Sequence, residues 1–310
     1  MRISATLLLA FLFANAYAQS PAKLYMLAKR SLEKGDHVQA VQQIDQAINQ
    51  DQSQLDYFLL RIEALTALEE YQQVLVTYTG SLQFFPEAIE LYVGRGILLL
   101  EFGENQYAIT DFSNALDLAI TKTDSLLVLN NRAAAKQGLR DFEGAYQDLV
   151  AAYQLDNTDA GVLINLGAVS DEVGRGDETL MYLLRALEVD PGSVAAMGNI
   201  GFKYQEEGAY QEAIRYFEMI LEQSPEEPLA FSNLSYCQYK LGKLEEAMES
   251  IQQSILYYAE NAYAYRTRAL IYLAQDETEN ACADLELAIT KGFTQQYGAE
   301  VTDLQKVHCE

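Results

Sequence analysis

Several residue types are scarce in this chain, and each scarcity excludes a class of function. The 310 residues include no tryptophan, two histidines, three cysteines and five prolines, and 21 Lys and Arg stand against 45 Asp and Glu. The formal charge of −24 argues against nucleic-acid binding, because a polyphosphate partner requires a basic surface. It argues equally against docking on an anionic membrane. With so few histidines and cysteines, and no HExxH, CxxC…CxxC or GxxxxGK[ST] spacing, we expect no metal site, no cofactor and no catalytic centre.

The first twenty residues have the pattern of a secretory signal peptide. Arg2 precedes about 12 apolar residues, and a small-x-small sequence, Ala-Tyr-Ala, follows them. A membrane-spanning helix needs roughly 20 apolar residues, and no other segment approaches that length. We therefore expect residues 1–18 to be a signal peptide cleaved after Ala18. The product would then be exported, to the periplasm or beyond, with no membrane insertion.

The remaining sequence is dominated by a unit of 34 residues that recurs eight times. The clearest copy is the segment from Val194 to Glu227, "VAAMGNIGFKYQEEGAYQEAIRYFEMILEQSPEE". A three-residue insertion, Thr123 to Ser125, separates the third copy from the fourth. The eight copies span residues 21–54, 55–88, 89–122, 126–159, 160–193, 194–227, 228–261 and 262–295.

The recurring positions describe a pair of closely packed helices. The eighth residue is small in seven copies and the twentieth is alanine in six, which lets two antiparallel helices approach each other. Larger apolar residues recur at positions 4, 11 and 24, for example Met197, Tyr204 and Phe217. Glycine stands at position 15 in five copies, where the first helix must end. Since a lone helical hairpin cannot bury its apolar face, neighbouring pairs must stack, and the pattern predicts an all-α repeat array.

This pattern resembles the tetratricopeptide repeat family, and the resemblance covers nearly all of the chain after residue 20. It implies a right-handed α-solenoid of eight helix-turn-helix repeats, in which the first helix of each pair lines a concave groove. Together with the signal-peptide pattern, it suggests an exported bacterial member of that family. The last residues, Gln296 to Glu310, carry Val301, Leu304 and Val307 on one side of a predicted helix. We interpret residues 296–310 as a C-terminal capping helix.

Two positions vary together among the copies. Three of the four repeats with arginine at position 7 carry aspartate at position 23, and no repeat with an apolar seventh residue has an acid there. An Arg–Asp ion pair between the two helices of one repeat explains this best, and an anionic-ligand site is the less favoured alternative. The predicted pairs are Arg95–Asp111, Arg132–Asp148 and Arg268–Asp284. The fourth arginine, Arg61, faces Thr77 and should lack that partner.

Two sets of residues are candidates for binding a partner in the implied groove. The first is a ladder of amides at position 6, which can bond to the backbone of an extended peptide: Asn131, Asn165, Asn199 and Asn233. The second gathers at groove positions of the last three repeats: Phe202, Tyr236, Tyr239, Tyr263 and Arg266. In each case the alternative is a structural role, with the amides contacting the adjacent repeat and the aromatic rings packed between repeats.

The three cysteines allow one disulfide, although sequence alone does not fix its connectivity. An exported protein meets oxidising conditions. Cys282 lies on the last second helix and Cys309 near the end of the predicted cap, a layout similar to the ending of many secreted tetratricopeptide proteins of Gram-negative bacteria. We expect a Cys282–Cys309 bond that fixes the cap to the array. Cys237 is expected to be a small buried core residue.

Taken together, these features favour a non-enzymatic scaffold that binds a protein or peptide in the groove of a tetratricopeptide superhelix. The alternative is a structural or assembly component of a bacterial envelope complex that uses its outer or edge surfaces. An enzyme is disfavoured, because the repeats occupy the chain and leave no catalytic domain. Neither the identity of the partner nor the oligomeric state follows from the sequence.

Overall fold

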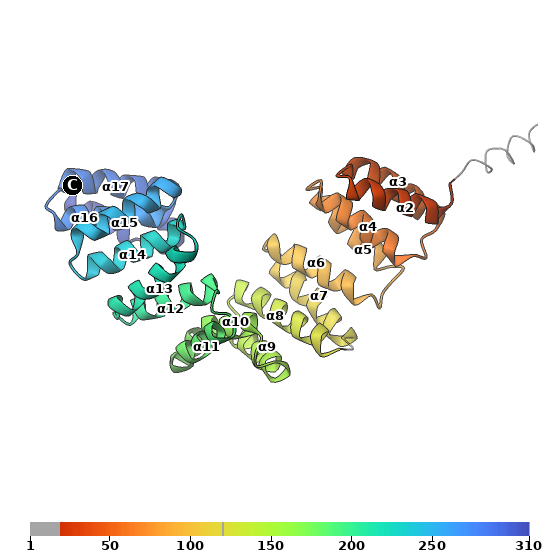
Figure 1. Cartoon of the computed structure of the whole chain (residues 1–310), viewed down its shortest axis with the longest axis horizontal. Helices are drawn as coiled ribbons and strands as arrows, with labels where there is room; N and C mark the ends of the chain where they lie inside the picture. Colours follow the sequence, from red (N-terminus) through yellow and green to blue (C-terminus); the bar gives the residue numbers. More distant parts are fainter. Residues whose placement is uncertain (1–18, 120, 310) are drawn as a thin grey trace, which may run out of the picture. The chain divides into compact units, whose positions relative to one another are not determined.

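The computed structural model describes residues 19–119 and 121–309, and the predicted signal peptide, residues 1–18, lies outside them. Within the described residues the secondary structure consists of helices joined by short turns, with no strand (Figure 1). The chain divides into two compact units, unit 1 up to Asp141 and unit 2 from Phe142 onward. The fold is an α-solenoid of helix-turn-helix repeats, and within each unit a helix packs on those next to it in the chain.

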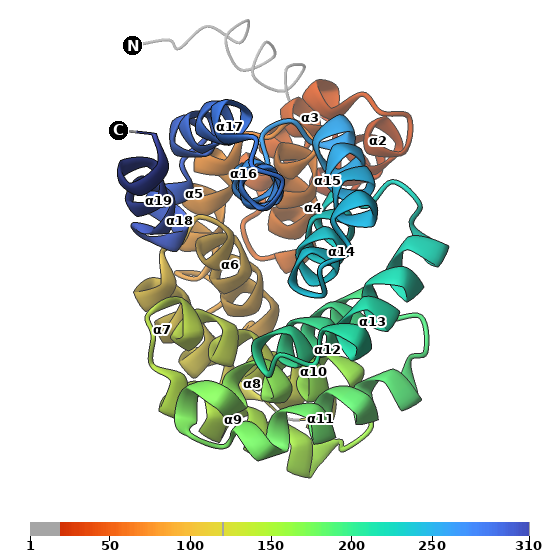
Figure 2. The same ribbon diagram turned by 90° about the vertical axis from the view of Figure 1, so that its left-hand side faces the viewer.

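Unit 1 contains the first three helix pairs and one helix of the fourth. The two helices of each pair contact each other, and helices of successive pairs are in contact as well (Figure 2). The bounds are α2 (Pro21–Glu33), α3 (His37–Gln50), α4 (Leu55–Thr66), α5 (Tyr71–Ser81), α6 (Ile89–Glu101), α7 (Asn105–Leu118) and α8 (Lys122–Gly138).

Unit 2 contains the remaining helix of the fourth repeat, four further pairs and two short terminal helices. Its first helices are α9 (Phe142–Leu155), α10 (Ala160–Ser170) with the 3₁₀ turn η1 (Asp171–Val173), and α11 (Gly176–Val189). They are followed by α12 (Val194–Glu206), α13 (Tyr210–Gln223), α14 (Pro228–Lys240), α15 (Leu244–Tyr257), α16 (Ala262–Ala274), α17 (Thr278–Thr290), α18 (Phe293–Tyr297) and α19 (Glu300–His308).

Every repeat turns at the same residue. The fifteenth position has a left-handed backbone in each copy, whether or not it is glycine: Gly35, Glu69, Gly103, Arg140, Gly174, Gly208, Gly242 and Asp276. The next backbone N–H donates to the carbonyl five residues before it, as from Asp36 to Ser31 at 2.9 Å and from Glu70 to Leu65 at 3.0 Å. This is the bonding of a Schellman motif, which ends a helix and satisfies its last carbonyls. The repeat therefore adopts this turn with or without glycine at position 15, and glycine there lowers the conformational strain of the left-handed backbone.

The two helices of a pair meet where position 8 faces position 24. At Gly96 and Gly201 an added methyl carbon would lie 2.7 Å from the ring of Phe112 or Phe217, closer than packed atoms allow. In the first repeat the facing residue is the smaller Ile44, and Ala28 takes the place of glycine, with both side chains fully buried. In these three repeats the small residue and its partner are thus matched in size.

The insertion between the third and fourth repeats lengthens a helix and does not form a loop. Helix α8 begins at Lys122 and is capped by Thr121, whose hydroxyl accepts from the Asp124 N–H at 3.1 Å. The Asp124 carboxylate accepts in return from the Thr121 N–H at 3.2 Å. This capping box starts the helix early, so that Thr123–Ser125 form part of its first turns.

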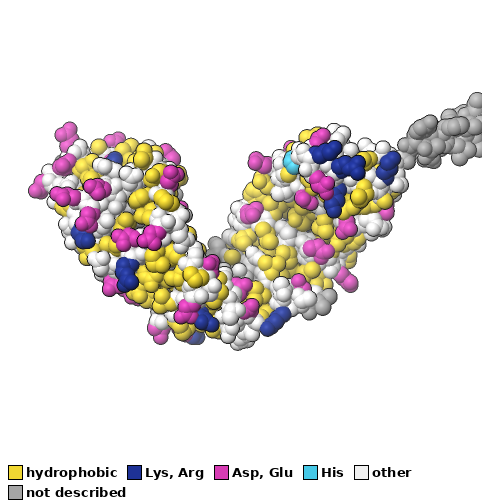
Figure 3. All heavy atoms as spheres, viewed as in Figure 1, with side chains coloured by type: hydrophobic (Ala, Val, Ile, Leu, Met, Phe, Trp, Pro, Cys, Tyr) yellow, Lys and Arg dark blue, Asp and Glu magenta, His cyan; other side chains and the backbone are white. Residues whose placement is uncertain are grey.

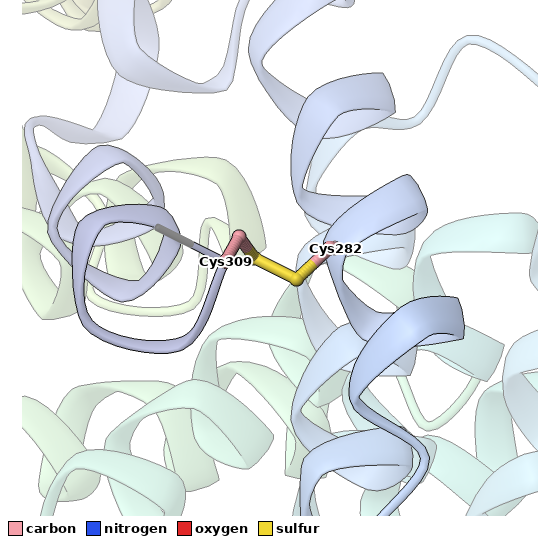
Figure 4. Close-up of a disulfide and its surroundings, with 2 residues drawn as sticks. All are labelled: Cys282 and Cys309. Atoms are coloured by element: carbon pink, nitrogen blue, oxygen red, sulfur yellow. A yellow bond between two sulfur atoms is a disulfide. The ribbon is translucent and has the colours of Figure 1, made fainter.

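The C-terminal end differs from the single helix expected over residues 296–310. It forms two short helices, α18 and α19, separated at Gly298, whose φ of 91° ends the first of them. Val301 is fully buried in the core of the eighth repeat together with Phe293, and Leu304 is partly buried there. Val307, expected on the same side, is 74% exposed because α19 covers the repeat only with its N-terminal half. Cys309, at the end of α19, is bonded to Cys282 of α17 (Figure 4).

Candidate functional site

Two of the predicted Arg–Asp pairs are formed within their repeats. Arg95 donates from Nε and Nη2 to the two oxygens of Asp111, both at 2.7 Å. Arg268 donates in the same manner to Asp284, at 2.6 and 2.8 Å. Both carboxylates are almost completely buried, so each has exchanged water for two charge-assisted hydrogen bonds. The hydrogen bond to Asp111 raises the pKa of Arg95 above its ordinary value, although burial opposes the shift. These arginines are therefore occupied by structural partners.

The third predicted pair stays a prediction, because Arg132 and Asp148 belong to different units. Asp148 is buried on α9, and Arg132 donates from Nη1 to the Ser113 hydroxyl at 3.1 Å.

The arginines also contact the preceding repeat, which the sequence comparison did not anticipate. Arg61 contacts the Thr77 hydroxyl as expected, but it also has a carboxylate partner, since its Nε donates to Asp45 of the first repeat at 2.6 Å. Arg95 donates from Nη1 to Thr79 at 3.2 Å in the equivalent way. A detectable signal existed, because position 25 of each preceding repeat carries a polar acceptor: Asp45, Thr79 and Ser113. Arg61 and Arg95 thus each connect three helices and not two.

The amides of the predicted ladder are partly engaged by their own helices. Asn131 donates from Nδ2 to the Leu127 carbonyl and Asn233 to the Leu229 carbonyl, both at 2.9 Å. Asn233 is buried, whereas Asn131, Asn165 and Asn199 are half-buried. Since Asn131 lies in unit 1 and the other three in unit 2, the ladder is not placed as one surface. The printed bonds of Asn131 and Asn233 are to their own helices and not to the adjacent repeat, the structural alternative that the sequence left open.

The predicted aromatic residues divide into one exposed ring and one packed cluster. Phe202 is 45% exposed on α12 and touches Phe217 of its own repeat edge-to-face, at 6.0 Å between ring centroids. Tyr236 lies 6.4 Å from Tyr239 and 6.2 Å from Tyr263, which links α14 to α16. We call Tyr236, Tyr239, Tyr263 and Arg266 the C-terminal aromatic cluster. Burial raises the pKa of Tyr263 to about 12, so its phenol ionises only at a higher pH than that of an ordinary tyrosine.

Arg266 is not a free groove residue, because the chain covers it from its own C-terminal end. Its guanidinium carbon lies 4.9 Å from the Tyr236 ring centroid and 5.4 Å from that of Tyr263. Glu300, at the start of α19, accepts a hydrogen bond from Arg266 Nε at 3.1 Å and also contacts Nη2. Only 7% of Arg266 remains exposed. Sequence reasoning missed this partner, because Glu300 reaches Arg266 only when α19 folds back.

The cysteines form one bond and leave one thiol. The Cys282–Cys309 disulfide spans 5.7 Å between Cα atoms and closes a separation of 27 residues. Cys237 is a buried free thiol whose Sγ lies 3.4 Å from the side-chain oxygen of Gln205. Burial raises the pKa of the Cys237 thiol to about 12, which keeps it protonated and unreactive.

Unit 2 has an excess of acidic side chains. Asp and Glu outnumber Lys and Arg in its sequence, and they also do so on the face of α14 to α17 drawn in Figure 3. Most basic groups there have carboxylate partners, as Lys203 has Asp171 at 2.7 Å and Lys291 has Glu260 at 2.8 Å.

Among residues 19–119 and 121–309, no three His, Cys, Asp or Glu side chains are grouped so that they could hold a metal ion. No helix in those ranges combines the length and apolar character needed to cross a bilayer.

Unit 1 has two cavities on the side of its second helices, one repeat apart. One, of about 380 Å³, lies beside Arg61 between α3, α4 and α5, and the other, of about 430 Å³, lies beside Arg95 between α5, α6 and α7. Apolar side chains at their rims are exposed, among them Val76, Phe84 and Tyr107. In both cavities the guanidinium is bonded to a carboxylate, and the remaining lining is mostly apolar, with polar side chains such as Asn49 in one and Glu104 in the other.

Comparison with known proteins finds a family model that matches part of the chain and solved structures of similar fold. Residues 204–271 match the family model described as "Tetratricopeptide repeat", which covers part of the sixth repeat, all of the seventh and part of the eighth. No curated protein sequence matches the chain. A tetratricopeptide repeat protein from Parabacteroides merdae matches over 93% of this chain and 100% of its own, with 20% identity and a TM-score of 0.58.

Two further solved structures are similar in the same way. The hetero-tetramer Cut9–Hcn1 of the APC/C matches over 93% of this chain and 55% of its own, with 17% identity and a TM-score of 0.67. PilF of Pseudomonas aeruginosa matches over 72% of this chain and 98% of its own, with 19% identity and a TM-score of 0.58. At these identities the likeness shows the fold, an α-solenoid of helix-turn-helix repeats.

Proposed function

We propose that this chain, whose fold is that of the tetratricopeptide-repeat proteins, is a non-enzymatic scaffold that binds a peptide or protein along the first helices of its repeats. One observation carries the proposal: Phe202, a large apolar side chain on a first helix, is nearly half exposed next to a fixed partner ring. A rigid, exposed aromatic side chain loses little entropy on binding and is a common anchor in interfaces. Stacked repeats hold such a side chain in place without a partner.

The half-buried tyrosines of the C-terminal aromatic cluster extend this surface toward the eighth repeat. Tyr236 and Tyr239 face each other on α14, and Tyr263 follows on α16. Asn165 and Asn199 lie on the preceding first helices, half-buried and able to bond to a peptide backbone. We propose no role in binding for Asn233, which is buried and bonded to its own helix.

A second candidate is an assembly component that uses its outer surface. The two largely apolar cavities favour it, with exposed Val76 and Phe84 at the rim of the one beside Arg61 and Tyr107 at the rim of the one beside Arg95. A partner there would contact second helices of unit 1, so the two candidates predict different contact residues.

Site-specific photo-cross-linking distinguishes the two candidates. A benzophenone amino acid is placed at Phe202, at Met219 on the second helix of the same repeat, or at Val76 in unit 1. The binding surface of first helices predicts a cross-linked partner from position 202 and none from position 219, although Met219 is also partly exposed. Cross-linking from position 76 alone would favour the outer surface. Weaker binding of the purified partner by Phe202→Ala, with unchanged helix content, would complete the test.

We further propose that the protein is exported after removal of residues 1–18. The disulfide between Cys282 and Cys309 supports this, because such bonds persist mainly in oxidising compartments. N-terminal sequencing of the protein recovered from the periplasm or the medium should begin at Gln19. A protein retained in the cytoplasm with Met1 intact would contradict the proposal.

A further inference from the structure

We propose that α19 is an intramolecular closure over Arg266, and that a dithiol reductant opens it by reducing the Cys282–Cys309 bond. In the closed form Glu300 and α19 occupy the end of the C-terminal aromatic cluster. In the open form the guanidinium of Arg266, which lies against the Tyr236 and Tyr263 rings, becomes accessible to a partner. The role for a partner rests on the proposed function, whereas the opening itself does not depend on one.

The first observation is that the closed form leaves Arg266 incompletely bonded. Glu300 takes Nε and Nη2, but Nη1 is fully enclosed and has no hydrogen-bond acceptor anywhere in the described chain. A buried donor without an acceptor is rare and unfavourable, even when it lies against aromatic rings. Glu300 is itself largely solvated, with 44% of its side chain exposed. The carboxylate is therefore an occupant that can leave, and not part of a sealed core.

The second observation is how little non-covalent contact holds α19. It is a nine-residue helix, shorter than the length at which an isolated helix is stable in water. Its one fully buried side chain is Val301, and Leu304 is partly buried. Thr302 and Gln305 are half-buried as well, and the Arg266–Glu300 pair and the covalent bond at Cys309 add to the docking. Removal of the covalent bond leaves a short helix that is joined to α18 through Gly298 and Ala299.

The third observation is that the bond is open to attack. Cys309 is exposed at the end of α19, while Cys282 is half-buried on α17 (Figure 4). One thiolate of a dithiol attacks Cys309 Sγ, which forms a mixed disulfide and releases Cys282 as the leaving thiolate. The second thiol of the reductant then displaces Cys309. Two electrons and two protons pass to the two cysteines, and the dithiol becomes its cyclic disulfide.

Arginine labelling of the full chain tests this closure without any partner. Phenylglyoxal reacts with accessible guanidinium groups, and digestion with mass spectrometry reports each arginine separately. Arg268 is the internal control, since it lies two residues away on α16 but is bonded to Asp284 within the repeat. After reduction with dithiothreitol we expect the labelling rate of Arg266 to rise about ten-fold and that of Arg268 to change less than about two-fold.

Two variants separate opening from unfolding. Cys282→Ser with Cys309→Ser should show the fast labelling of Arg266 without reductant, with the helix content of the oxidised protein retained. Glu300→Gln in the oxidised protein should accelerate Arg266 less than reduction does, because the disulfide still holds α19. Unchanged labelling of Arg266 after reduction would overturn the proposal, as would an equal rise at Arg268. Faster labelling in Glu300→Gln than in the reduced protein would also overturn it. Failure here leaves the cross-linking result at Phe202 unaffected, so the two proposals fail separately.

Discussion

The Asp111 carboxylate accepts two hydrogen bonds of 2.7 Å from Arg95, across the two helices of one repeat. Only 3% of the carboxylate side chain and 20% of the arginine side chain are exposed. If one group is removed, the other cannot be fully hydrated. The Arg95–Asp111 pair therefore contributes to the stability of its repeat, unlike an exposed surface ion pair.

Removal of this carboxylate should therefore be costly. We expect Asp111→Ala to lower the free energy of unfolding by about 3 kcal/mol, because a mostly buried guanidinium loses its partner. Glu188→Ala is the control, since the Arg185–Glu188 pair is exposed on both sides and should contribute less than about 0.5 kcal/mol. Urea unfolding followed by circular dichroism measures both. Equal stability of the two variants would contradict a structural role for the Arg95–Asp111 pair.

The three repeats that turn without glycine should be improved by it. Glu69 and Asp276 have φ values of 59° and 61°, in the region that costs an L-residue roughly 1–2 kcal/mol. We expect Glu69→Gly and Asp276→Gly each to stabilise the protein by about 0.5–1 kcal/mol, after the greater freedom of glycine in the unfolded chain is subtracted. Gly103→Ala, at the same position of the third repeat, should destabilise it. Thermal unfolding of the three variants measures the effect, and destabilisation by both glycine variants would refute it.

The size match between positions 8 and 24 predicts a coupled pair. We expect Gly201→Ala to cost about 1–3 kcal/mol, because its methyl group would lie 2.7 Å from the Phe217 ring. Phe217→Ile in the same chain should recover part of this loss, since the first repeat combines Ala28 with Ile44. A double-mutant cycle by denaturant unfolding gives the coupling. Purely additive losses would show that the two positions do not share a packing space.

Alkylation counts should reflect one bond and one enclosed thiol. In denaturant without reductant, intact mass should show a single alkylated cysteine, Cys237, and after reduction three. In the native oxidised protein at pH 8 no cysteine should react within minutes, because Cys237 is buried and protonated. Three labelled thiols before reduction would exclude the disulfide.

Stability should fall on the alkaline side. Burial raises the pKa of Cys237 and of Tyr263 to about 12, whereas both groups ionise near their ordinary values in the unfolded chain. The unfolded state therefore binds fewer protons above pH 9, and the contribution of both groups, complete below that pH, declines as pH rises toward 12. The decline should be less steep between pH 9 and 10 in Cys237→Ala. An identical pH profile for the variant and the wild type would show that this thiol does not contribute.

The helix pairs and their internal ion pairs could be predicted because equivalent positions can be compared among eight copies within one sequence. Positions 7 and 23 vary together within the chain, which predicted Arg95–Asp111 and Arg268–Asp284 without any other protein. Contacts between repeats were harder to predict, since Asp45 and Arg61 are related only through the stacking of one pair on the next. Outside the period there is no second copy to compare. The break at Gly298 and the return of Glu300 to Arg266 depend on tertiary packing that no local pattern records.

Export and partner binding are harder to predict from the sequence, for a different reason. The signal-peptide pattern concerns residues 1–18, which lie outside the described part of the chain. A binding surface is defined by the partner as well as by the chain, and side chains such as Tyr236 can anchor a ligand or pack between repeats with the same sequence pattern. Exposure is a property that the sequence pattern does not record: Asn233 is buried, whereas Phe202 is 45% exposed.

The reach of Arg61 to Asp45 has a consequence for how the first repeat opens. In a linear array the terminal repeat has one neighbour only and would melt before the others, independently of them. Here, unfolding of the first repeat would remove the carboxylate partner of the Arg61 guanidinium in the second repeat and leave it with the Thr77 hydroxyl as its acceptor. The first two repeats should consequently melt as one cooperative block, which protects amide hydrogens at the N-terminal end of the array from early exchange.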